Sequence, residues 1–153
     1  MRLEPLYRLR FVHTNSWDTH LTGKLGTEEQ HFFLADGRCE GRVIGRFRAA
    51  NAPRRRADAM FTPMFHSVIE TDGGATIYLE WRGYGRAYPP GRRQWLVAGV
   101  HLSEAPQYTW LNDAIVVGTG EVRWSDQIDP TDLNASPDLV LDVAELAWEP
   151  IAE

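Results

Sequence analysis

Hydrophobic and polar residues alternate with a period of two along most of the chain, which is typical of half-buried β-strands rather than of helices. The clearest case is the segment 6–13, where one face carries Tyr7, Leu9, Phe11 and His13 and the other carries arginines. Successive side chains of a strand point to opposite sides of the sheet. The apolar face of this segment is therefore predicted to point into a core.

A hairpin is the strongest local prediction. Two alternating segments, 65–71 and 75–81, flank the turn residues 72–74, and two of these are glycines that can supply the positive φ of a tight turn. The register that follows places His66 opposite Trp81 on one largely apolar face.

The remaining alternation predicts the rest of the fold. Six further strands are expected, the last two from weaker patterns: Arg42–Arg48, Arg93–Leu102, Ala114–Trp124, Leu139–Trp148, Leu25–Leu34 and Arg54–Met60. A helical turn capped by Ser103 is expected over 103–112, and a loop over 126–138. About eight short strands separated by turns predict a single all-β domain over residues 1–153. Its expected form is a closed antiparallel β-barrel, lipocalin-like or allene-oxide-cyclase-like in shape, with one or two short helical turns.

Composition narrows the class of protein. Six Trp, five Tyr and six Phe among 153 residues favour a packed core over disorder. Cys39 is the one cysteine, which excludes an intramolecular disulfide and a cysteine zinc site. The segment 1–5 lacks a signal-peptide pattern and no run is apolar enough to cross a bilayer, so we expect a cytoplasmic protein with no membrane partner. The formal net charge of -5 and the lack of a recognisable module argue against nucleic acid as a partner.

Three segments together resemble a known family: the Thr-Asp-x-Gly-Ala hairpin at 71–75, the glycine-rich 82–86, and the Tyr-x-Trp-Leu-Asn motif at 108–112. They resemble an uncharacterised bacterial family of small β-barrels known only as domain of unknown function 3237, and the likeness covers most of the chain. Many members have a glycine-rich loop that ends in Ala-Asp-Trp, whereas the segment 56–59 keeps Asp58 and lacks the tryptophan. The resemblance implies a small antiparallel barrel and brings no established activity.

The five histidines stand singly, so their spacing predicts neither a metal site nor a cofactor. His66 and His101 are the candidate catalytic pair. Each is predicted to share an inward face with a tryptophan, His66 with Trp81 and His101 with Trp95, and an imidazole can transfer a proton near neutral pH. The alternative for each is a structural histidine with one satisfied hydrogen bond.

Other candidate ligand contacts come from arginines, aromatics and glycines that interleave in the segment 81–93. The arginines could bind the carboxylate of an acidic ligand, because the guanidinium group matches carboxylate geometry. The alternative is that they form ordinary ion pairs on the surface. Asp58 is either a site acid or an ion-pair partner of neighbouring arginines. Trp81 and Trp95 are predicted to line the pocket. Arg82, Tyr84 and Arg86 are predicted to stand at its rim. Trp110 and Asn112 are predicted to close one end of the barrel.

Three functional hypotheses remain open from the sequence. The first is a protein that binds a small apolar or aromatic molecule, with an acidic group, inside the barrel. The second is a cofactor-independent isomerase, cyclase or lyase acting on such a molecule. The third is a surface-interaction protein whose barrel is filled by its own side chains. A homodimer is expected, because aromatic residues and arginines are typical of interfaces.

Overall fold

The computed structural model describes residues 2–56, 58, 60–88, 92–123 and 137–150. Within these ranges the chain is all-β, as the sequence predicts, and its strands pair antiparallel. The predicted loop 126–138 lies almost wholly outside the described residues. None of the described helices is both long and apolar enough to span a membrane.

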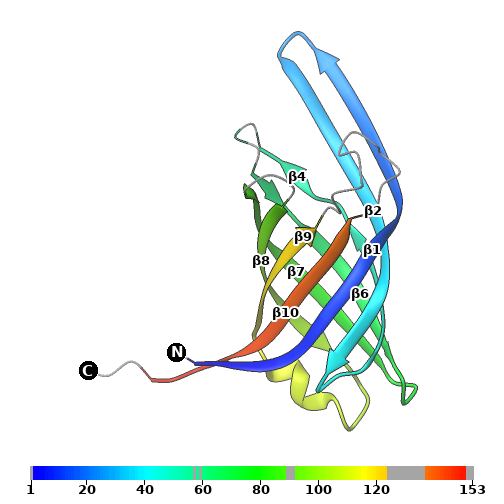
Figure 1. Cartoon of the computed structure of the whole chain (residues 1–153), viewed down its shortest axis with the longest axis vertical. Helices are drawn as coiled ribbons and strands as arrows, with labels where there is room; N and C mark the ends of the chain where they lie inside the picture. Colours follow the sequence, from blue (N-terminus) through cyan, green and yellow to red (C-terminus); the bar gives the residue numbers. More distant parts are fainter. Residues whose placement is uncertain (1, 57, 59, 89–91, 124–136, 151–153) are drawn as a thin grey trace.

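Eight strands form a ring of hydrogen-bonded neighbours in the order β7-β6-β3-β2-β1-β10-β9-β8, and the pairing of β8 with β7 completes it (Figure 1). Their bounds are β1 (Arg2–Gly23), β2 (Gly26–Gly41), β3 (Gly45–Asn51), β6 (Met64–Thr71), β7 (Thr76–Tyr88), β8 (Arg92–Leu102), β9 (Val116–Arg123) and β10 (Asp138–Ala147). The short strands β4 (Arg54–Arg55) and β5 (Phe61–Thr62) extend the sheet beside β7. The predicted strand 54–60 is thus reduced to two residues.

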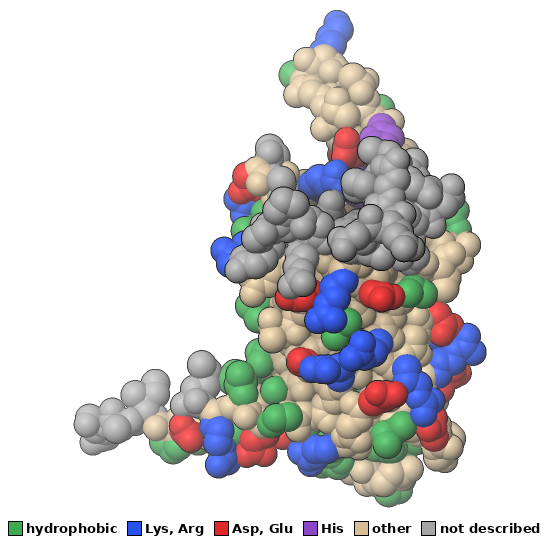
Figure 2. All heavy atoms as spheres, in the orientation of Figure 1, with side chains coloured by type: hydrophobic (Ala, Val, Ile, Leu, Met, Phe, Trp, Pro, Cys, Tyr) green, Lys and Arg blue, Asp and Glu red, His purple; other side chains and the backbone are tan. Residues whose placement is uncertain are grey.

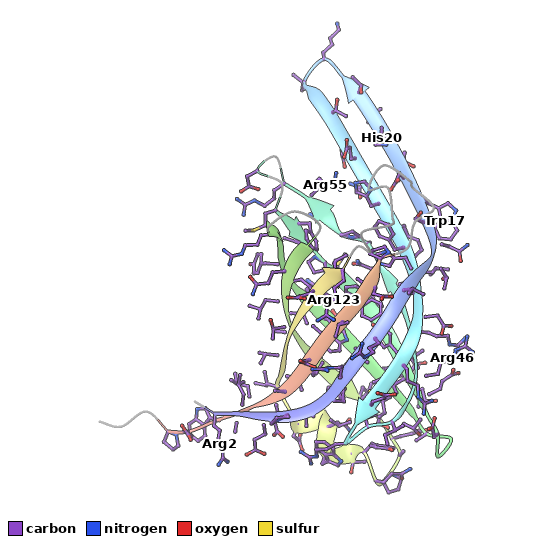
Figure 3. The ribbon with its side chains drawn as sticks, viewed as in Figure 1. Arg2, Trp17, His20, Arg46, Arg55 and Arg123 are labelled. Atoms are coloured by element: carbon purple, nitrogen blue, oxygen red, sulfur yellow. The ribbon has the colours of Figure 1, made fainter. Side chains whose placement is uncertain are left out.

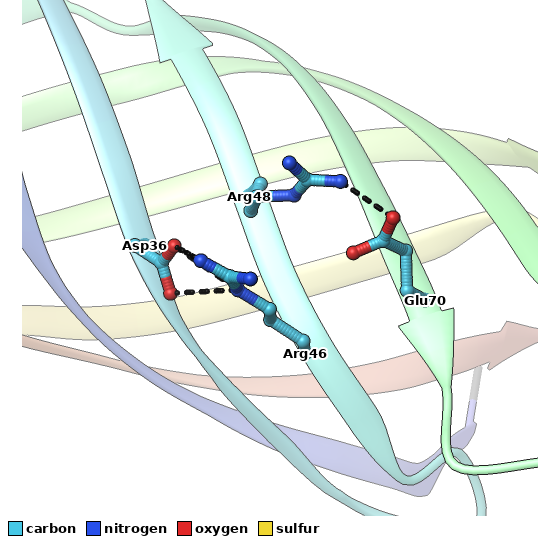
Figure 4. A network of polar contacts seen from close by, with 4 residues as sticks. All are labelled: Asp36, Arg46, Arg48 and Glu70. Carbon is cyan, nitrogen blue, oxygen red and sulfur yellow. Dashed lines mark hydrogen bonds and ion pairs between the residues drawn. The ribbon is translucent and has the colours of Figure 1, made fainter.

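The alternating pattern explains which face of each strand lies inside the ring. On β1 the inward residues Tyr7, Leu9 and Phe11 are buried, as predicted. The arginines that alternate with inward residues lie on the outer face and pair with acids across strands. Arg46 of β3 contacts Asp36 at 2.5 Å, and Arg48 contacts Glu70 in the same way (Figure 4). Arg8 pairs with Asp142, and Arg38 pairs with Asp72. In Figure 2 such charged side chains spread over the outer face shared by β1 and β10.

The register of the β6–β7 hairpin differs by one residue from the prediction. His66 lies opposite Glu80, and Trp81 lies opposite Phe65. The turn is one residue shorter than expected, because Thr71 pairs with Ala75: its backbone N–H donates to the Ala75 carbonyl at 2.8 Å, and its Oγ1 accepts from the Ala75 N–H at 2.9 Å. Since side chains alternate along a strand, a shift of one residue reverses the face of every β6 residue.

The strands β1 and β2 continue past the ring as a two-stranded arm made of residues 14–23 and 26–32 (Figure 1). A register shift lies at its base, between His13 and Asn15. Figure 3 shows Trp17 and His20 on this arm, beyond the body of the barrel. The sequence predicts a strand over 25–34 but not the hairpin that it forms with β1.

The 3-10 helix η1 (Thr109–Asp113) lies at the opposite end of the ring from the arm (Figure 1). The Asn112 side chain holds it there, because it accepts a hydrogen bond from the N–H of Ser103 and donates one to the carbonyl of Ser103. The residue before η1 is Tyr108, which makes no side-chain cap. The predicted cap, Ser103, instead donates its hydroxyl to the carbonyl of Thr76. We call the two ends of the barrel the arm end and the η1 end.

Candidate functional site

Five polar or partly polar side chains lie buried among the apolar residues of the ring, and we call them the interior polar cluster: Tyr7, Ser67, Trp81, Trp95 and His101. They come from β1, β6, β7 and β8. Ser67 and His101 occupy one rung of the sheet on either side of Leu79. The rings of Trp81 and His101 are in contact, with centroids 6.5 Å apart. Tyr7, Ser67, Trp81 and His101 therefore lie in one region of the interior, whereas Trp95 lies about 20 Å further along β8, toward the arm end.

Tyr7 and His101 are joined by a hydrogen bond within this cluster, with 2.6 Å between the phenol oxygen and Nε2. Burial raises the pKa of Tyr7 well above its ordinary value. Burial also lowers the pKa of His101 to about 4, because a charged imidazole would lose its hydration. At neutral pH the phenol therefore keeps its proton, and we assign its O–H as the hydrogen-bond donor to Nε2, because the described residues offer this hydroxyl no other acceptor. The proton of the neutral imidazole is then on Nδ1.

Four buried atoms of the cluster have no hydrogen-bond partner: Ser67 Oγ, Trp81 Nε1, Trp95 Nε1 and His101 Nδ1. A buried polar group left unpaired costs about 1–3 kcal/mol. Most buried polar groups in folded proteins are paired, so four such atoms in one interior are unusual for a region that serves only as core. They are the strongest indication of a site in the described residues.

Aromatic rings fill the interior of the ring between this cluster and the arm end. Phe11 contacts Phe47, Phe65 and Trp95 with centroid separations of 5.0, 6.0 and 5.9 Å, and Phe65 contacts Trp95 at 5.6 Å. The interior at this level is therefore occupied by the protein's own side chains. A molecule that reached the cluster from the arm end would have to displace some of these rings.

A second group of polar residues lies at the arm end and was not predicted from the sequence. His13, Phe33 and His31 form a stack, with centroids 4.6 Å apart for the first pair and 6.3 Å for the second. Nδ1 of His31 lies 2.5 Å from Oδ1 of Asp18, its cross-strand neighbour. Burial lowers the pKa of His13 to about 4, so its imidazole is neutral at pH 7. The only indication of this group in the sequence is that His13 occupies an inward-facing position of the alternating first strand.

Of the predicted catalytic pair, only His101 faces the interior. The prediction that His66 lines the interior is wrong, because the register shift turns it to the exposed outer face. The inward positions of Trp81 and Trp95 agree with the prediction, and both are buried. The two proposed catalytic histidines therefore lie on opposite sides of the barrel wall.

The three predicted rim residues, Arg82, Tyr84 and Arg86, all point outward from β7 and are exposed. The glycines between them do not change the face of the later side chains, and the alternation continues to Arg86. Arg82 lies 3.4 Å from Glu80, and Arg86 donates to the side chain of Gln94 at 3.1 Å. Among the arginines whose side chains the structure describes, none is buried in the ring, so none of these makes the expected contact to an acidic ligand inside it.

The other predicted contacts lie away from the interior polar cluster. Asp58 is exposed and pairs with Arg56 at 2.7 Å, the alternative that the sequence left open. Trp110 and Asn112 lie in η1, where the guanidinium of Arg42 stacks over the Trp110 ring at 4.2 Å. Among the described residues, no group of three or more His, Cys, Asp or Glu side chains is placed to hold a metal ion.

Solved structures with the same arrangement of strands are known. A β-barrel-like protein from Acinetobacter baumannii superposes with a TM-score of 0.74 at 21% identity, over 95% of this chain and 96% of that one. A protein of unknown function from Clostridium acetobutylicum gives 0.74 at 14% identity, over 96% and 100%. An enzyme from Penicillium herquei gives 0.58 at 20% identity, over 92% and 93%. The likeness is one of fold. No family model and no curated protein matches the chain.

Proposed function

We propose that the barrel binds a small apolar or aromatic molecule at the interior polar cluster. The observation that carries this proposal is the set of four buried atoms without a partner. Within a purely structural core, each of these atoms is destabilising, whereas a bound molecule with matching polar groups would pair them. Barrels of about eight strands are wide enough to hold one small ligand.

The surroundings of the cluster support an apolar or aromatic ligand. The residues around it are the tryptophans themselves, Leu79 and the phenylalanines toward the arm end. Because these rings now occupy the interior, the ligand would take the place of rotated side chains rather than fill a preformed space. Binding would therefore change the environment of Trp95 and Trp81, which can be followed by fluorescence.

The first prediction is that aromatic small molecules raise the melting temperature of the protein and change its tryptophan emission. A ligand at 100 times its Kd adds about 2.7 kcal/mol to the free energy of unfolding. Trp95→Phe removes one unpaired N–H at the cluster and should weaken binding several-fold. Trp17→Phe is the matched control, because Trp17 lies on the arm and is half exposed.

Failure of a broad aromatic set to shift the melting temperature would contradict the proposal. Equal loss of binding in the Trp95 and Trp17 variants would also count against it, because it would move the site out of the barrel. Both variants keep an aromatic ring at the substituted position, so a difference between them reports on the N–H group and its location.

A cofactor-independent isomerase, cyclase or lyase is the second candidate. The buried Tyr7 and His101 pair favours it, since a fixed imidazole that holds its proton on Nδ1 can donate a hydrogen bond or a proton to a bound molecule. The similarity to a Penicillium herquei enzyme adds support at the level of the fold. Product analysis of any ligand that binds, with His101→Gln alongside, separates this candidate from simple binding.

A further inference from the structure

The unpaired atoms of the interior polar cluster differ in what they offer a ligand. Indole Nε1 of Trp81 and of Trp95 can only donate a hydrogen bond. His101 Nδ1 is also a donor, because Tyr7 donates to the other ring nitrogen and leaves the proton on this one. Ser67 is the single group that can also accept. The cluster therefore presents three donors to a ligand and needs acceptors in return.

Among the side chains that the structure describes, no charged group is buried in the interior to balance an ion. The buried polar residues are Asn51, Ser67, Thr71, His101 and Ser103, and none is an acid, a lysine or an arginine. The imidazole of His101 is neutral at pH 7, because burial lowers its pKa to about 4. An anion placed among these residues would lose its hydration without gaining a counter-ion, which is strongly unfavourable. A neutral hydrogen-bond acceptor loses much less hydration free energy when it is buried there.

The donors also have a defined direction. The bond from Tyr7 fixes the orientation of the His101 ring, just as a second partner orients a metal-binding histidine. The Trp81 ring meets the His101 ring at 61°. Two neighbouring donors on rigid rings suit a single oxygen with two lone pairs, which is the geometry of a carbonyl group.

We propose that the ligand of the barrel is a neutral molecule whose carbonyl-type oxygen accepts hydrogen bonds from His101 Nδ1 and Trp81 Nε1. This inference rests on the proposed binding function and names its ligand class: ketones, aldehydes, lactones or quinones attached to an apolar or aromatic body. It replaces the acidic ligand expected from the arginine content, since the arginines whose side chains the structure describes lie on the outer surface.

Three substituted naphthalenes test the ligand class: 2-acetylnaphthalene is a neutral acceptor, 2-naphthoate is an anion, and 2-ethylnaphthalene is apolar and lacks an acceptor. Their dissociation constants are measured by calorimetry at pH 7.5. The ketone is expected to bind about tenfold more tightly than the ethyl compound, the equivalent of one good hydrogen bond. The naphthoate is expected to bind more weakly than the ketone by at least that factor.

Two variants locate the donors. Tyr7→Phe removes the O–H that holds the His101 tautomer, and Trp81→Phe removes an N–H while keeping a ring. Each should reduce the preference for the ketone over the ethyl compound several-fold while leaving the affinity for the ethyl compound nearly unchanged. Tyr78→Phe is the control, because Tyr78 is exposed on the outer face of β7. Circular dichroism and the melting temperature confirm that each variant is folded. If either Tyr7→Phe or Trp81→Phe fails to fold, the other variant still tests whether the ketone preference depends on these donors.

The outcomes separate the two proposals. Tighter binding of the naphthoate, or equal binding of the ketone and the ethyl compound, would overturn the neutral-carbonyl inference and leave barrel binding standing. An unchanged ketone preference in a folded Tyr7 or Trp81 variant would also overturn it. Absence of binding by all three probes would count against the binding function itself.

Discussion

Tyr7 and His101 are 94 residues apart in the chain and meet in the barrel interior. The inward face of each residue could be predicted from the alternation of its own strand. Their contact could not, because it depends on which strands lie beside one another in the ring. Ser67 was missed for a different reason. The predicted register of β6 placed its side chain on the outer face, whereas in the register that the Thr71 bond in the turn accompanies, Ser67 faces inward.

Two buried histidines should make the stability of the protein depend on pH. The pKa values of His13 and His101 are both lowered to about 4 in the folded chain, against 6.5 in the unfolded chain. Above pH 6.5 these two imidazoles are neutral in both the folded and the unfolded chain, so the free energy of unfolding is not reduced by their protonation. Below it the unfolded chain takes up protons that the folded chain does not, so stability falls as pH falls from 6.5 toward 4.

The expected loss in this window is about 1.4 kcal/mol per pH unit for each histidine. Urea denaturation between pH 7.5 and 5 measures it, above the range in which most carboxylates titrate. His101→Gln should roughly halve the slope, whereas His66→Gln, on the exposed outer face, should leave it unchanged. A stability that is flat across this interval would show that neither imidazole is held neutral by burial.

Individual strands approach one another closely at inward-facing glycines. Gly120 of β9 is the clearest case, because a Cβ there would lie 2.2 Å from the carbonyl oxygen of Val140 and 2.5 Å from Nε1 of Trp95. The Trp95 indole therefore packs against β9 only because position 120 has no side chain. Alternation alone predicts the strand, but the reason for a glycine at this position requires the neighbouring strand.

Gly120→Ala is expected to destabilise the protein by about 1–3 kcal/mol, the usual cost of adding a methyl group to a packed interior. Gly73→Ala is the control, since a Cβ at position 73 meets only Thr71 Oγ1, at 4.0 Å. Denaturation midpoints of the two variants give the comparison. If Gly120→Ala were as stable as the parent, the close packing of Trp95 on β9 would be wrong.

On the scale of the whole molecule, the outer surface has two parts. Ion pairs cover β1, β2, β3, β6 and β10, whereas the outer face of β7, β8 and the start of β9 carries large apolar residues. We call the latter the apolar strip, and its members are more than half exposed: Tyr78, Tyr84, Leu96, Val100, Leu102 and Ile115. Contiguous exposed apolar residues of this kind are typical of protein interaction surfaces.

A homodimer through the apolar strip is the remaining prediction. Glu80 and Arg82, 3.4 Å apart, lie within the strip, so two copies related by a two-fold axis could exchange these partners. Leu96→Glu should shift the sedimentation coefficient to that of a monomer. Ile44→Glu, also exposed but between β2 and β3, should leave the dimer intact. A parent chain that sediments as a monomer at high concentration would rule the dimer out.

The ring and the arm differ in how they expose backbone groups. Around the ring each strand has a hydrogen-bonded neighbour on both sides, so it offers no edge on which another chain could add a strand. In the arm, by contrast, residues 15–23 pair with β2 alone among the described strands. Among the described residues, it is therefore the arm, and not the ring, that offers a long free edge to foreign strands. Acidic side chains along it, such as Asp18, Glu28 and Glu29, would oppose aggregation there by mutual repulsion.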